Sequence, residues 1–82
     1  MIKPRLNAEF FRVKGRISGQ KPLTVEAAGD NFLLWSHDFD FRRELQQFPV
    51  DAKVEFIGQL GLHRGKWQLV VEQPAWLLKR PS

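Results

Sequence analysis

Residues 54–72, VEFIGQLGLHRGKWQLVVE, carry the clearest structural pattern in this chain. Apolar and polar side chains alternate on both sides of a central segment, and alternation with a period of two is typical of β-strands. Gly61 and Gly65 enclose that segment, and glycine readily adopts the positive φ angles of hairpin turns. The stretch therefore predicts a β-hairpin whose loop lies between these two glycines.

One face of this hairpin is apolar and is expected to lie in the core. Its residues are Val54, Phe56, Leu60, Trp67, Leu69 and Val71. Trp67 is accordingly expected to be a core residue and not a ligand contact.

A long strand is predicted near the start of the chain, over residues 9–18. Phe11, Val13 and Ile17 share one of its faces and are expected to point inward. Gly15 lies on the same face, and a glycine inside a strand often marks a bend. The bend would let this strand serve two sides of a small barrel.

Two shorter strands are predicted at residues 23–27 and 32–36, with a turn between them. A turn of two or four residues would place Leu33 and Trp35 on the outer face. A turn of three would send Trp35 into the core, because a one-residue slip exchanges the two faces of a strand. The sequence leaves both registers open.

A helix is predicted at residues 41–47, where apolar side chains recur at helical spacing. Asp40 would cap its N-terminus, and Pro49 would follow its end. The aromatic residues expected in the core beneath it are Phe39, Phe41 and Phe48. Residues 75–78 are expected to dock on the barrel, with Trp76 packed against its end.

The 82 residues are expected to form one domain, since this length supports a single small core. Residues 1–8 are predicted to be a loose leader, and residues 79–82 a polar tail. The chain has no cysteine, no signal-peptide pattern and no run of about 18 apolar residues. These features favour a cytoplasmic protein without membrane contact.

Catalytic and metal-binding motifs have little support in the sequence. The two histidines, His37 and His63, lie in separate predicted loops, and no serine stands in a Gly-x-Ser-x-Gly motif. Asp38 and Asp40, beside His37, are better explained by helix capping than by a metal site. We therefore expect neither enzymatic activity nor a cofactor or metal.

A basic pattern follows the outer face of the first predicted strand. Arg12, Lys14 and Arg16 recur with a period of two, so their side chains lie ~7 Å apart, close to the phosphate spacing of an extended single strand. The formal net charge of +4 also favours an acidic partner such as nucleic acid. The alternative is a solvated face in which these residues pair with Glu26 on the neighbouring strand.

The order of three strands, a helix and two strands, with a long glycine-bent first strand, resembles the OB-fold, a five-stranded all-β barrel of Greek-key type. FRVKGRI (residues 11–17), VEFIGQL (54–60) and GKWQL (65–69) are similar to the first strand and last hairpin of bacterial single-stranded-DNA-binding proteins. The hairpin here is shorter than in those proteins, and their acidic C-terminal tail is missing.

The resemblance implies that the outer face of the first three strands binds the ligand, between two loops. Basic residues surround that face in this sequence: Lys21 in the first loop, and His63, Arg64 and Lys66 in the second. Aromatic side chains stack on bases in single-strand binders, and Trp35 is the candidate platform, followed by Phe10. We therefore expect binding of single-stranded DNA or RNA with little sequence preference.

A protein-interaction module, or a homo-oligomer, is the alternative. Three Trp and seven Phe are more than a core of this size can bury together with its aliphatic residues. Leu33 and Trp35, or residues 76–78, would then form an exposed apolar patch of the kind that marks a partner surface. Nucleic-acid binding should weaken with salt, whereas an apolar contact should not.

Overall fold

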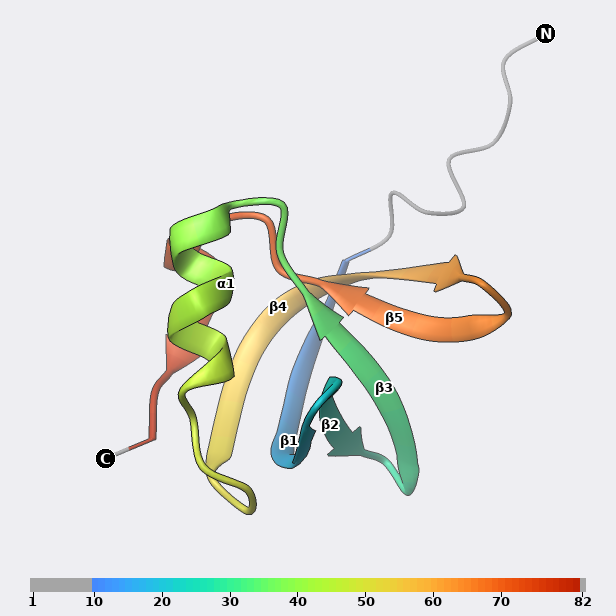
Figure 1. Ribbon diagram of the computed structural model, residues 1–82, viewed down its shortest axis with the longest axis horizontal. Coiled ribbons are helices and arrows are strands. Elements are labelled where there is room, and N and C mark those ends of the chain that lie inside the picture. The colour runs from blue at the N-terminus through green and yellow to red at the C-terminus, as the bar shows by residue number, and fades with distance from the viewer. Residues whose placement is uncertain (1–9, 82) are drawn as a thin grey trace, which may run out of the picture.

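The structure is a computed structural model that describes residues 10–81 (Figure 1). Its strands are β1 (Phe10–Gln20), β2 (Leu23–Ala27), β3 (Asp30–Trp35), β4 (Lys53–His63), β5 (Lys66–Val70) and β6 (Leu77–Lys79). Helix α1 (Phe39–Gln46) lies between β3 and β4, and a short 3-10 helix, η2 (Pro74–Trp76), precedes β6. The expected leader, residues 1–8, lies outside the described residues.

The first five strands form a closed barrel (Figure 1). Strand β2 lies between β1 and β3, β3 pairs in parallel with β5, β5 pairs with β4, and β4 pairs with β1 to complete the ring. Strand β6 joins β4 at Glu55 and Phe56. The predicted small all-β barrel with one short helix is confirmed, and its topology is compatible with an OB-like fold.

Strand β1 pairs with two neighbouring strands, as the glycine inside it predicts. Its first half pairs with β4 and its second half with β2, so Arg16 lies opposite both Lys53 and Glu26. At Gly15 the chains approach so closely that a Cβ atom would lie 2.5 Å from the carbonyl oxygen of Glu26. The missing side chain therefore allows the strand to change partners at this corner.

A two-residue turn joins β2 to β3. Ala28 and Gly29 have φ angles of 54° and 85°, which suit a tight hairpin because the turn then matches the twist of the strands. This register decides between the two alternatives for Trp35, whose side chain lies on the outer face with 36% of its surface exposed.

The last hairpin extends past the barrel as an arm, which we define as residues 62–67 (Figure 1). Arg64 and Gly65 form its turn, with φ angles of 51° and 79°. The predicted loop between Gly61 and Gly65 is therefore wrong, because β4 continues through Gly61 to His63.

The core assignment of Trp67 is also wrong. Trp67 lies opposite Leu62 in the arm, and these two side chains are 55% and 63% exposed. Trp67 does share a face with the buried Leu69, but the arm projects beyond the residues that could cover it. The alternating pattern therefore assigned Trp67 to the correct face of the strand. It was wrong about burial, because no other part of the barrel packs against that face at the arm.

Helix α1 packs its apolar side chains into the core. Phe41 and Leu45 from the helix, and Phe48 just after it, are buried among inward residues of the strands. The helix and the strands thus share one small core, with the helix outside the ring of strands (Figure 1).

The helix begins two residues earlier than predicted. Its N-cap is Asp38, whose Oδ1 accepts a hydrogen bond from the backbone N–H of Phe41 at 3.0 Å. Asp40, the expected cap, lies in the first turn instead. Phe39 was expected in the core and is 60% exposed, because the earlier start places it on the outer side of the helix.

The C-terminal segment docks on the barrel, as predicted, and adds a short strand that was not predicted. Trp76 is half-buried against the core. Lys79 belongs to β6, and the Arg80 Nε donates to Glu44 Oε2 at 2.7 Å, so these two residues of the expected tail are attached to the fold. Within residues 10–81, no helix is long and apolar enough to cross a membrane.

Candidate nucleic-acid interface

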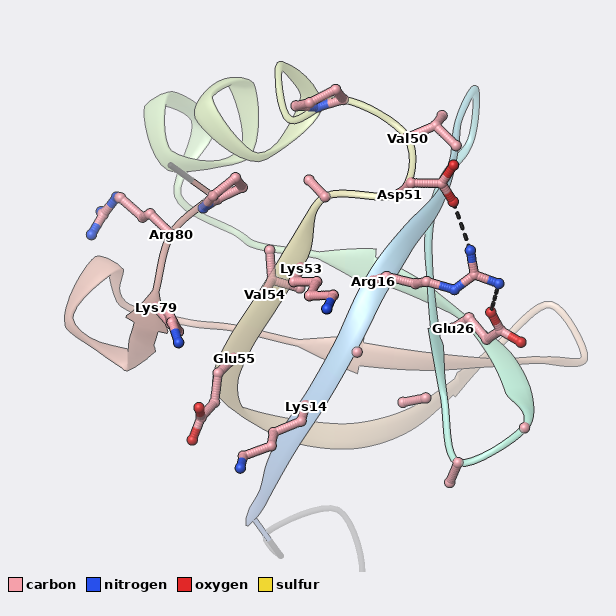
Figure 2. A pocket seen from close by; sticks show the side chains of 17 residues that line it. Lys14, Arg16, Glu26, Val50, Asp51, Lys53, Val54, Glu55, Lys79 and Arg80 are labelled. Atoms are coloured by element: carbon pink, nitrogen blue, oxygen red, sulfur yellow. Dashed lines mark hydrogen bonds and ion pairs between the residues drawn. The ribbon is translucent and has the colours of Figure 1, made fainter.

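An open groove of about 1000 Å³ runs over the outer faces of β1 and β4 and reaches the segment that includes β6 (Figure 2). Cations outnumber acids along it. The cationic residues that line it are Lys14, Arg16, Lys53, Lys79 and Arg80, and the acidic ones are Glu26, Asp51 and Glu55. Two of the three predicted basic residues of β1, Lys14 and Arg16, therefore lie beside cations from two other strands, and we call this surface the basic groove. The third, Arg12, does not line it.

Arg16 is held by two carboxylates of the basic groove. Its guanidinium pairs with Glu26 at 2.5 Å and with Asp51 at 2.6 Å (Figure 2). The hydrogen bond with Glu26 is the largest cause that raises the pKa of Arg16, followed by the charge of Glu26, with Asp51 adding to both effects. The predicted alternative of a stripe paired with Glu26 is thus correct for this residue.

Arg12 is similarly paired, since its Nε lies 2.5 Å from Glu55 Oε2. Both arginines nevertheless remain accessible, with 69% of the Arg12 side chain and 52% of the Arg16 side chain exposed. Exposed ion pairs such as Arg16–Asp51 contribute only about 0–1 kcal/mol, so a phosphate could compete for Arg16 at little cost to the fold. The Arg12 pair is different, because only 13% of the Glu55 side chain is exposed and its loss of a partner would cost more.

Three lysines of the basic groove differ from its arginines in that they have no acidic partner among the described residues. Lys14, Lys53 and Lys79 make no ion pair within residues 10–81. Lys14 and Lys79 lie on either side of Glu55 in the strand register, although that carboxylate pairs with Arg12. Lys53 lies directly opposite Arg16, whose charge is already balanced by Glu26 and Asp51. The three lysines are therefore the cations of the groove that an incoming anion could reach without displacing a carboxylate.

Trp35 lies apart from the basic groove. It is on β3, whose neighbours are β2 and β5, whereas the groove covers β1 and β4. The guanidinium of Arg42 stacks over the Trp35 ring at 4.0 Å from the ring centroid and also lies 5.5 Å from the Phe39 centroid. Arg42 donates to the carbonyl oxygen of Ser36 at 3.1 Å, so one face of the expected platform is occupied by a fixed cation.

The remaining predicted site residues do not join the basic groove either. His63, Arg64 and Lys66 are exposed around the tip of the arm. His63 follows Glu55 by eight positions of β4, which corresponds to about 26 Å along an extended strand. Lys21 is exposed in the turn between β1 and β2.

Phe10 is the aromatic residue that does lie in line with the groove. It begins the same outward row of β1 as Arg12 and Lys14, at a period of two. Its ring centroid is 5.1 Å from that of Trp76, with the two planes at 78°. From the sequence, Phe10 was the second candidate platform, after Trp35.

Lys53, Lys79 and Arg42 were not predicted from the sequence as site residues. The first two join the groove only through the pairing of β4 with β1 and β6, over long stretches of chain. The helical position of Arg42, one turn after Asp38 at the start of α1, was available as a signal that it could reach back toward β3.

Two of the three residues considered as a metal site, His37 and Asp38, have other partners. His37 Nδ1 lies 2.8 Å from Glu72 Oε1, and Asp38 caps α1. Across residues 10–81, no three His, Cys, Asp or Glu side chains gather in a group that could hold a metal ion.

Comparisons of the chain with protein-family models, curated proteins and solved structures gave no match.

Proposed function

We propose that this protein binds single-stranded nucleic acid along the basic groove, with little sequence preference. The observation that carries the proposal is the set of three lysines, Lys14, Lys53 and Lys79, that surround one open groove without an ion pair in the described part of the chain. Phosphate groups would supply the missing partners, and the released counterions would drive binding.

The shape of the groove favours a single strand. Outward side chains of β1 stand ~7 Å apart, so consecutive cations can each meet one phosphate of an extended chain. The lining residues include no asparagine or glutamine, the side chains that read adenine most directly, and Arg16 is already held by two carboxylates. Both features support recognition of the backbone over recognition of sequence.

A pair of double variants tests the proposal. Lys14→Glu with Lys53→Glu reverses two charges in the groove, and Arg64→Glu with Lys66→Glu makes the same change in net charge on the arm. We expect the groove variant to abolish binding of labelled oligo-dT or oligo-U in fluorescence anisotropy, and the arm variant to retain most of it. Thermal melts of both variants show whether the barrel remains folded.

Salt and ligand structure complete the experiment. Wild-type affinity for the single strands should fall steeply between about 50 and 200 mM salt, and a matched duplex should bind more weakly. Equal losses in the two variants would mean that net charge alone attracts the oligonucleotide. No binding by the wild type at low salt would contradict the proposal outright.

A second candidate function, self-association or binding of a protein, is favoured by the apolar surface of the arm. Leu62 and Trp67 face each other there with most of their surface exposed. They lie on the same face as Leu60 and Leu69, which line an apolar groove of about 270 Å³ at the adjoining end of the barrel. Exposed patches of this kind often mark a partner surface.

Sedimentation velocity tests this second candidate. If two copies associate through the arm, the wild type should form a dimer that persists in high salt, and Trp67→Ser should be monomeric. A wild type that is monomeric at all accessible concentrations would exclude self-association, and co-purification with and without Trp67→Ser would then test for another protein.

A further inference from the structure

Phe10 places a large aromatic side chain on the solvent-facing side of the barrel. Its side chain points to the outer face of β1 and remains 52% exposed. Each same-face position along the strand advances ~7 Å, so Phe10 stands one such step before Arg12 and two before Lys14. An aromatic ring thus begins the outward row of β1 that enters the basic groove at Lys14.

The contact with Trp76 keeps this ring in place without covering it. Because the two planes are nearly perpendicular, the edge of one ring meets the face of the other. At most one face of Phe10 is used in this contact, and 52% of the residue remains exposed. Trp76 is itself packed against the core, which gives Phe10 a rigid support.

A flat, supported and exposed ring next to phosphate-binding groups is what a nucleobase can stack upon. We propose that Phe10 is the base-stacking position of this protein, with the phosphates on the flanking nucleotides held by Arg12 and Lys14. This inference rests on the proposed function, since it needs a nucleic-acid strand in the groove. It replaces Trp35 as the platform, because Trp35 lies on another strand and already carries Arg42.

The test compares two ligands and two variants. Oligo-dT offers both bases and phosphates, whereas inorganic polyphosphate offers charge alone. Phe10→Ala should weaken oligo-dT binding roughly 5- to 150-fold, the range measured for loss of one stacked base, and leave polyphosphate binding within about twofold. Phe10→Tyr should keep wild-type affinity for both ligands, since it retains the ring.

Each outcome separates this inference from the proposed function. If wild-type protein does not bind oligo-dT, the proposed function fails and the stacking site with it. If wild-type protein binds and Phe10→Ala binds equally well, the basic groove stands and Phe10 is not the platform. An equal loss for oligo-dT and polyphosphate, with a lower melting temperature, would show that Phe10 supports the fold and would also overturn the inference.

Trp76 provides a direct optical readout. In a variant carrying Trp35→Phe and Trp67→Phe, Trp76 is the remaining indole of the chain. A base stacked on Phe10, 5.1 Å away, should change Trp76 fluorescence on addition of oligo-dT and not on addition of polyphosphate. Unchanged fluorescence at saturating oligo-dT would contradict the proposed position.

Discussion

Gly15 occupies the point at which β1 exchanges one partner for the other. Its position opposite Val54 belongs to the pairing with β4, and the next residue, Arg16, also pairs with β2. A Cβ atom here would meet the Glu26 carbonyl oxygen at 2.5 Å and a methyl group of Val25 at 3.0 Å. The first of these is backbone, which cannot move aside without disturbing the sheet.

We therefore predict that Gly15→Ala destabilises the protein by about 1–3 kcal/mol, the usual cost of overpacking. Gly61→Ala is the matched control, because a Cβ atom there meets nothing within 4 Å. That substitution should leave stability unchanged or raise it by up to about 1 kcal/mol. Urea unfolding followed by circular dichroism measures both values, and equal effects would contradict the argument.

The direction in which single side chains point was predictable from the sequence, and the extent to which they are buried was not. Alternation correctly placed Ile17, Val25 and Phe56 in the core, where each is fully buried. The same rule assigned Trp67 to the core, yet Trp67 is exposed on the arm. Alternation reports only which face a side chain occupies. Whether anything lies over that face depends on how far the strand extends beyond its neighbours.

At the scale of elements, α1 shows how a capping side chain sets a boundary. Asp38 and Asp40 are both acidic residues near the start of the helix, but only Asp38 accepts a hydrogen bond from the backbone, at Phe41. The backbone N–H of Asp38 in turn donates to Ser36 Oγ at 3.1 Å. The link between β3 and α1 is thus built from side-chain hydrogen bonds.

Asp38→Ala should consequently cost about 1 kcal/mol of stability, with a range of roughly 0.5–2 kcal/mol for caps of this type. Asp40→Ala should cost less, about 0.3–1 kcal/mol, since Asp40 acts only through its charge near the helix N-terminus. Melting temperatures of the two variants test the order. A larger loss for Asp40→Ala would restore the cap predicted from the sequence.

Elements were predictable where their signals are local. The second strand matches its predicted bounds, and the tight turn at Ala28 and Gly29 follows one of the two registers left open. Strand β6 has only three residues and exists because β4 offers it a partner. Since Lys79 lies in that strand and Lys53 lies at the start of β4, two of the five cations of the basic groove depend on pairings that no local pattern reveals.

At the scale of the whole molecule, stability rests on few residues. A domain of 82 residues is expected to be stable by only about 4–12 kcal/mol. Leu45 is 1% exposed and joins α1 to the inner side chains of the barrel. Removal of its side chain leaves a cavity between helix and sheet, which neighbouring backbone cannot fill.

Leu45→Ala should therefore cost about 2–5 kcal/mol and lower the melting temperature by at least about 8 °C. Leu62→Ala, the same change on the exposed arm, should alter stability by no more than about 0.5 kcal/mol. Differential scanning calorimetry compares the two. A small effect of Leu45→Ala would mean that the helix contributes little to the core.

The pairing of β1 with β4 also bears on how the chain is synthesised. Arg12 and its partner Glu55 are 43 residues apart, so at ~5–20 residues per second the ribosome needs about 2–9 s to supply the second strand after the first. During that interval the first half of β1 is an unpaired strand that carries Phe10 and Phe11. Charged side chains, lysine above all, discourage such edges from joining other chains. We therefore expect the basic row of β1 to disfavour aggregation of the nascent polypeptide while it still lacks β4.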